Sequence, residues 1–248
     1  MLEIAANSVA SALAAQEGGA GRVELCCALE LGGLTPSCAQ IALAREKLSI
    51  PLYVLIRPRA GDFLYSDMEC ETMLRDIEAC AQAGCDGVVL GVLDADGRID
   101  QPRCRSLMAA AGSMGVTFHR AFDLTRDPLS ALEDVIALGC ERVLTSGGRA
   151  SAIEGAEPIR QLVQLAAGRI AVMPGAGVDA RTIGELMALT GASEFHASAK
   201  RLHTSGMRWQ PPLLKDMQGG EWQSDVEQVR SISAALNEAR HSKNHSTL

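Results

Sequence analysis

The sequence predicts a single-domain (β/α)8 TIM barrel of the α/β class, and three observations support this. Eight short apolar runs of strand character alternate with longer stretches of helical periodicity along the 248 residues. Consecutive runs start 20 to 35 residues apart, which is the length of one βα unit. No linker or change of composition interrupts the alternation, so we predict one barrel over residues 1–240 and a flexible polar tail over residues 241–248. A doubly wound open sheet is the main alternative.

The predicted strands are short and rich in Val, Ile, Leu and Ala, as expected for strands that helices cover. Aromatic residues make up only 3% of the chain, so aliphatic side chains supply most of the core. The eight predicted strands span residues 2–6, 22–27, 52–57, 87–92, 116–120, 142–146, 170–174 and 194–198.

Helical patterns fill the gaps between these strands, and three of them have clear ends. The pattern in residues 67–84 stops at Gly84, a residue that commonly ends helices. The pattern in residues 127–140 places Pro128 in the first turn, where its missing N–H costs nothing. The last pattern, residues 224–240, begins with a serine and repeats apolar residues every three or four positions.

Composition and charge narrow the classes of function. A net charge of −7 argues against nucleic acid as a partner, because phosphate contacts need a basic face. The longest apolar runs are too short to span a bilayer, and the N-terminus lacks the features of an export signal. Eight scattered cysteines in such a chain favour reduced thiols and a cytoplasmic location. Apolar residues within 208–217 are compatible with a homodimer contact.

Charged residues collect on faces of the strands that would point into the barrel. Alternation along the strands puts Glu24, Arg57, His119 and His196 in the interior, near the C-terminal ends where barrel enzymes carry their sites. One interpretation is a structural layer of ion pairs. The other is a catalytic site in which Glu24 or His119 acts as general acid or base and Arg57 clamps an anionic substrate group.

Two adjacent cysteines stand in the segment VELCCALELGGLTPS. Alternation turns Cys26 toward the barrel mouth and Cys27 toward the helices, so the two cannot chelate one metal, and a disulfide between them would be strained. Cys26 could converge with His119 and His196, and thiolate with imidazole would suit Cu(I) or Zn(II). The metal candidates are therefore Cys26 and His196.

Gly-rich turns follow the sixth and seventh predicted strands. In barrels of this type a phosphate site commonly lies near the loops after strands seven and eight. The anion-binding candidates are Ser146, Gly147, Gly175, Gly177 and Lys200. Tight βα turns are the alternative reason for these glycines. The long loop 57–67 is either an active-site lid or a packed Ω-loop.

Seven segments together resemble the CutC family, whose members are described as copper homeostasis proteins. They occur in order between residues 23 and 200 and read VELC with GGLTPS, LIRPRAGDFLYSD, GCDGVVLGVLDADGRID, TFHRAFD, RVLTSGG, MPGAGV and EFHASAK. The resemblance implies a cytoplasmic (β/α)8 barrel, a role in copper homeostasis and Cu(I) binding through cysteine, which falls on Cys26.

Two functions therefore stand side by side. The first is copper homeostasis, with copper as the bound ion. The second is an enzyme that acts on a small anionic or phosphorylated metabolite through Glu24, His119 and Arg57. A regulatory barrel without catalysis is a third. The sequence leaves open whether the protein is an enzyme.

Overall fold

The structure is a computed structural model that describes residues 1–209 and 219–245, and the side chains up to residue 242. Of the segment 208–217, where a homodimer contact is predicted, all but residues 208 and 209 lie outside the described part.

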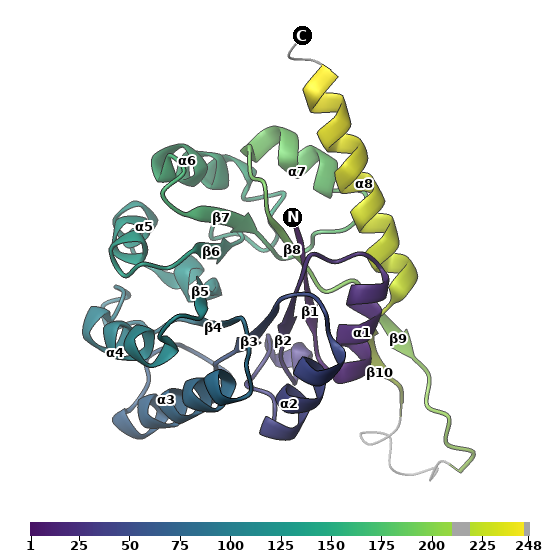
Figure 1. The fold of residues 1–248 in the computed structure, drawn as a ribbon. Coiled ribbons are helices and arrows are strands. Elements are labelled where there is room, and N and C mark those ends of the chain that lie inside the picture. Colours follow the sequence, from purple (N-terminus) through teal and green to yellow (C-terminus); the bar gives the residue numbers. More distant parts are fainter. Residues whose placement is uncertain (210–218, 246–248) are drawn as a thin grey trace.

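Eight parallel strands form a nearly closed barrel with the helices on its outside (Figure 1). The hydrogen-bonded order runs from β7 down to β1 and then to β8, so neighbours in sequence are neighbours in space. The strands are β1 (Leu2–Ala6), β2 (Arg22–Leu25), β3 (Leu52–Leu55), β4 (Gly87–Leu90), β5 (Gly115–Phe118), β6 (Arg142–Thr145), β7 (Ala171–Pro174) and β8 (Phe195–Ala197). The predicted (β/α)8 barrel is thus confirmed, with most strands shorter than predicted because their last residues turn into the loops of the barrel mouth.

Helices follow the strands in the predicted alternation. They are α1 (Val9–Glu17), α2 (Cys38–Lys47), α3 (Asp67–Gln82), α4 (Gln101–Ala111), α5 (Pro128–Ala137), α6 (Ala156–Ala166), α7 (Ile183–Thr190) and α8 (Val226–His245), with short 3-10 helices η1 (Leu29–Leu31) and η2 (Arg120–Leu124). Local chemistry explains several starts. Ser66 and Glu69 form a capping box at α3, and the Asp127 carboxylate caps α5 ahead of Pro128.

The C-terminal part differs from the expectation in two ways. An antiparallel hairpin of β9 (Lys200–His203) and β10 (Glu221–Ser224) lies between β8 and α8 and projects beside the barrel (Figure 1). Helix α8 runs on to His245, so residues 241–245 of the predicted tail are helical, while residues 246–248 lie outside the described part. No helix in the described ranges is long and apolar enough to cross a membrane.

The N-terminal end of the barrel interior holds an ion-pair layer, formed by Glu3, Arg22, Arg142 and Glu194. Arg22 is hydrogen-bonded through Nε to Glu3, and its Nη2 lies 2.9 Å from Glu194 Oε2. Arg142 Nε lies 3.0 Å from the same Glu194 oxygen. Both guanidinium groups also lie 5.1 Å from the centroid of the Tyr53 ring, which adds cation–π attraction. This layer contains none of the four residues for which a structural layer of ion pairs was predicted, namely Glu24, Arg57, His119 and His196.

Replacing Arg22 with Met would test how much the barrel depends on this layer. We expect the free energy of unfolding in urea to fall by about 3–5 kcal/mol, because the substitution removes a hydrogen-bonded cation from the fully buried Glu3 and from the partly buried Glu194. The matched control is Arg75→Met on α3, where an exposed arginine pairs with Glu71 at 2.8 Å, and its loss should be much smaller. Equal losses in both variants would contradict a structural role for the layer.

Candidate functional site

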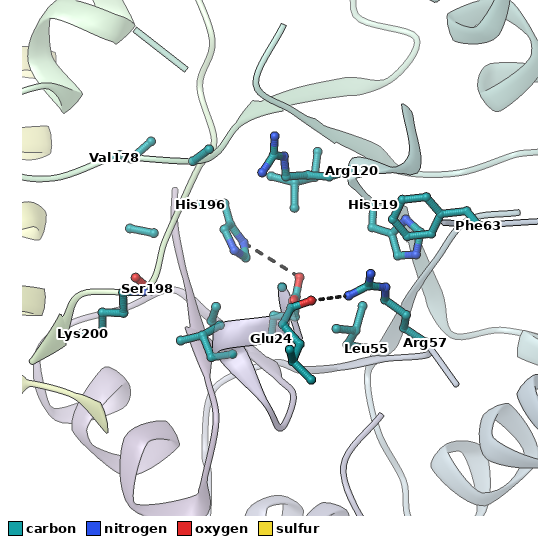
Figure 2. A pocket seen from close by; sticks show the side chains of 18 of the residues that line it. Glu24, Leu55, Arg57, Phe63, His119, Arg120, Val178, His196, Ser198 and Lys200 are labelled. Carbon is teal, nitrogen blue, oxygen red and sulfur yellow. Dashed lines mark hydrogen bonds and ion pairs between the residues drawn. The ribbon is translucent and has the colours of Figure 1, made fainter. Parts of the chain in front are cut away.

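The C-terminal mouth of the barrel is hollowed into a cavity of about 590 Å³. Figure 2 shows that its side chains come from opposite sides of the barrel and converge on a common space. Four charged residues are predicted to face the interior. For three of them, Glu24, His119 and His196, the surroundings shift the pKa of the side chain. All four, Arg57 included, line the cavity. The structure thus brings the predicted Glu24, Arg57, His119 and His196 together.

Glu24 follows Arg22 on the inward face of β2 and is only 5% exposed. Its Oε2 is buried without a hydrogen-bond partner, 3.9 Å from His196 Nδ1. Burial raises the pKa of this carboxyl to about 7, and the neighbouring Glu3 charge raises it further while His196 opposes the shift. Glu24 can therefore both accept and release a proton near neutral pH.

His196 on β8 is held by Glu3 on β1, the strand beside it. His196 Nδ1 lies 2.7 Å from Glu3 Oε1, and the other Glu3 oxygen accepts from Arg22. Although Glu3 is completely buried, its hydrogen bonds to His196 and Arg22 and the Arg22 charge outweigh the desolvation and hold its pKa down at about 2. Burial opposes the charged imidazole, but the two glutamates raise the His196 pKa. Glu3 is not among the predicted site residues, although its inward position on the first strand was the signal for it.

His119 follows β5 and presents a neutral imidazole. Its Nδ1 accepts the Ala121 N–H at 3.2 Å, so the proton of the neutral ring sits on Nε2, which is buried without a partner. Burial lowers the pKa of His119 to about 3, and the Arg57 charge lowers it further. The ring fits closely against β4, because a Cβ on Gly91 would lie 2.7 Å from it. His119 is therefore suited to donate a hydrogen bond rather than to act as the general base predicted as one of its roles.

The Arg57 guanidinium group is held in place by backbone carbonyls more than it is free to bind a substrate. Its Nη1 donates to the carbonyls of Leu31 at 2.8 Å and Gly33 at 2.9 Å, and its Nη2 donates to that of Gly61 at 2.9 Å. Its Nε is buried without a partner. Within the described ranges the hydrogen-bond partners of its guanidinium group are all backbone carbonyls and not carboxylates. Arg57 therefore orders the surrounding loops and leaves an uncompensated positive charge beside the cavity.

The loops after β7 and β8 form the opposite wall. Gly177 and Val178 line the cavity, and their N–H groups donate no hydrogen bond within the described part of the chain. Ser198 and Lys200 lie beside them (Figure 2), and the Lys200 ammonium sits 5.4 Å from the Trp222 ring centroid. Of the predicted anion-binding residues, Gly177 and Lys200 thus face the cavity. Gly175 uses its N–H on Thr145 and lies close to His196, so it contributes to the joint between β7 and β8.

The loop after β6, where an anion site is predicted, already binds a carboxylate of the chain itself. Asp123 in η2 accepts the Ser146 N–H at 3.0 Å and the Gly148 N–H at 3.2 Å, and its other oxygen accepts the Ser146 hydroxyl at 3.0 Å. Gly147 N–H donates to Thr145 Oγ1 at 2.9 Å. Ser146 and Gly147 are therefore outside the cavity lining, because an internal anion satisfies this loop. Sequence reasoning placed an external anion where Asp123 lies.

Cys26 points into the barrel as predicted, yet it lies beneath the mouth rather than in it. It is fully buried in a small apolar cluster with Tyr53, Leu55 and Val89. Burial raises the pKa of its thiol well above the usual range. Among the described residues, no group of three Cys, His, Asp or Glu ligands includes Cys26. The structure therefore does not assemble a metal site from Cys26 and His196.

The long loop after β3 packs against the site. The Phe63 ring contacts the His119 ring at a centroid distance of 4.8 Å, and the Arg57 guanidinium carbon lies 5.1 Å from the Phe63 centroid. Arg59 holds the loop by hydrogen bonds to Asp62 and to Glu69 of α3. These contacts are those of a packed Ω-loop, which covers one side of the cavity.

A family model described as the CutC family matches residues 1–201. A curated relative from Xylella fastidiosa strain Temecula1, named as a family protein CutC, is 59% identical over 237 residues, which cover 96% of this chain and 89% of the relative. A human protein named copper homeostasis protein cutC homolog is 45% identical over 240 residues, which cover 94% of this chain and 88% of the human protein.

Solved structures agree with the architecture. A CutC crystal structure from Streptococcus agalactiae superposes with a TM-score of 0.77 at 33% identity, covering 80% of this chain and 98% of that one. A thiamine phosphate pyrophosphorylase from Pyrococcus furiosus reaches a TM-score of 0.61 at 13% identity, covering 96% of each chain. That second likeness shows the barrel fold alone.

The raised pKa of Glu24 gives the protein a pH dependence with a definite sign. The folded chain holds this proton up to about pH 7, whereas the unfolded chain releases it near 4.5. Its contribution to stability is therefore greatest below pH 4.5 and is lost as the pH rises through 7. Glu24→Gln should become more stable than the wild type by about 1–3 kcal/mol between pH 5 and pH 8, as measured by urea unfolding. Glu78→Gln, at an exposed position of α3, is the control and should show no such trend.

Proposed function

The chain belongs to the CutC family, and from that premise we propose that its barrel mouth binds a small anionic molecule and moves a proton on it. One observation carries the proposal. Glu24 Oε2 and His119 Nε2 are buried polar atoms without hydrogen-bond partners among the residues that the structure describes, and both residues line the same cavity. Unpaired buried polar atoms are costly, so sites that keep them do so where a ligand completes the pairing.

The roles follow from the protonation states. Glu24, with a pKa near 7, is the general base that takes a proton and returns it as acid. His119 is neutral and carries its proton on Nε2, so it would donate to an oxygen on which negative charge develops. The nearby Arg57 charge strengthens that stabilisation in a buried setting. The pair matches proton transfer next to a carbonyl or a similar oxygen.

The anionic part of the ligand would lie on the β7–β8 wall. The free N–H groups of Gly177 and Val178 and the side chains of Ser198 and Lys200 are donors there, and none of these residues carries negative charge. Backbone N–H groups with a nearby ammonium are a common setting for phosphate. We therefore propose a small phosphorylated carbonyl compound as the substrate class.

The copper role is proposed from the names of the relatives. The residues do not fit Cu(I) at the predicted place, because Cu(I) prefers thiolate ligands and Cys26 is a single buried thiol. We propose that the chain contributes to copper homeostasis through the molecule handled at its mouth. All eight cysteines are free, which supports a reducing, cytoplasmic setting.

The enzyme proposal can be tested with inorganic phosphate and dihydroxyacetone phosphate as probes. Phosphate should bind the full chain, and Lys200→Ala with Ser198→Ala should weaken binding roughly tenfold or more, as expected for lost charge-assisted hydrogen bonds. In D₂O the wild type should exchange carbon-bound protons of dihydroxyacetone phosphate, followed by ¹H NMR. Glu24→Gln should abolish exchange and keep phosphate binding.

The same experiment has clear contrary outcomes. Glu78→Gln is the control and should behave as the wild type in both assays. Exchange that survives in Glu24→Gln would remove Glu24 as the base. Absence of phosphate binding at about 10 mM, far above common substrate affinities, would remove the anion site.

A Cu(I) titration tests whether Cys26 is a copper ligand. Anaerobic, reduced wild type and Cys26→Ser should compete equally with a Cu(I) chelator, because a buried thiol of high pKa without a second soft ligand binds weakly. Circular dichroism would confirm that the variant is folded. Stoichiometric binding in the wild type that the variant loses would overturn this expectation and restore Cys26 as a copper ligand.

A further inference from the structure

Beneath the proposed proton-transfer site, three potential ligands from three neighbouring strands converge. One carboxylate oxygen of Glu3 on β1, one of Glu24 on β2 and one ring nitrogen of His196 on β8 all lie within 4.8 Å of one another. In Figure 2 the His196 ring and the Glu24 carboxylate approach each other across the floor of the cavity. We propose that these three residues bind a divalent first-row transition cation.

The separations are those that a small cation needs. Ligand atoms at about 2.1 Å from a tetrahedral metal lie about 3.4 Å apart. His196 Nδ1 lies 2.7 Å from Glu3 Oε1 and 3.9 Å from Glu24 Oε2, so the two observed distances bracket that value. The third separation, between the Glu3 and Glu24 oxygens, is at most 4.8 Å, so changes of about 0.5–1.4 Å in these separations would complete the geometry.

An unpartnered ligand atom points to the same place. Glu24 Oε2 is fully buried and makes no hydrogen bond, although a buried carboxylate normally has a partner. Glu3 and His196 share the contact that the cation would replace, and binding would displace the proton between them. The cation would therefore supply what Glu24 lacks.

The ion-pair layer leaves Glu24 without an arginine partner. Arg22 and Arg142 pair with the buried Glu3 and the partly buried Glu194. Arg142 Nη1 also lies 3.0 Å from Glu141 Oε2. Neither guanidinium group pairs with Glu24, and the ion pair of Glu24 among the described residues is the 3.9 Å contact with His196.

The surroundings resemble a built site. The second oxygen of Glu3 accepts from Arg22, whose other nitrogen contacts Glu194, so the ion-pair layer fixes the orientation of Glu3. Glu24 and His196 line the cavity, which leaves room for water or a ligand oxygen at the remaining coordination positions. Mixed carboxylate and imidazole donors suit Zn²⁺, Mn²⁺ or Co²⁺ better than Cu(I) or Ca²⁺. The metal site is a separate proposal from proton transfer, because binding needs no substrate, and a cation on Glu24 would displace the proton that this carboxyl otherwise carries.

The test uses Mn²⁺ and Co²⁺ alone on chelator-treated, reduced full-length protein at pH 7.5. Mn²⁺ binding is followed by loss of the free-ion EPR signal, and Co²⁺ binding by its visible spectrum, in which thiolate ligands would give a separate intense band. We expect one ion per chain and no thiolate band. Glu24→Gln and His196→Gln should each weaken binding at least tenfold, while Cys26→Ser and Glu78→Gln should leave it unchanged.

Glu24→Gln keeps the shape of the side chain, and Oε2 has no hydrogen bond to lose among the described residues, so this variant should fold. A fully folded Glu24→Gln that binds Mn²⁺ as the wild type does would overturn the proposal. Absence of stoichiometric binding at 1 mM Mn²⁺ and Co²⁺ would also overturn it. Retained proton exchange without metal binding would sink the metal site and leave the proposed function standing, so the two failures are distinguishable.

Discussion

The Glu3 carboxylate joins the structural and the functional halves of the barrel. One of its oxygens accepts from Arg22 in the ion-pair layer, and the other bonds His196 at the mouth. Because β1 pairs with both β2 and β8, this one side chain also spans three adjacent strands of the barrel. A fully buried carboxylate is tolerable only with such strong partners. The position of His196, and through it the environment of Glu24, depends on this arrangement.

Charged groups at the two ends of the barrel interior differ in how fully they are paired. At the N-terminal end, arginines and glutamates satisfy one another around Tyr53, and the result is stability. At the C-terminal end, Glu24 and His119 keep unpaired atoms and shifted pKa values. The barrel geometry causes this separation, since the loops that admit ligands all leave the strands at the C-terminal end.

The ligand types at the mouth bear on the copper role of the family. Oxygen and imidazole donors surround the cavity, whereas Cys26 is sealed below among apolar side chains. The proposed ligands, a small anion and a divalent cation, suit a site of this composition, which offers Cu(I) little. The donors available to a ligand are therefore those of a polar, solvent-accessible barrel mouth. A role in copper homeostasis would act through these groups rather than through a thiolate copper site.

The sequence by itself determined the barrel and the inward set of residues. Strand and helix periods are local properties, and alternation alone places Glu24, Cys26, His119 and His196 inside. Partners and protonation states were decided by the tertiary structure. Glu3 and His196 are separated by 193 positions, and nothing local marks them as a pair. Likewise, Asp123 fills the loop after β6, and burial together with Arg57 keeps His119 neutral. These outcomes depend on which groups meet in space and how deeply they are buried, and only the closed barrel brings those groups together.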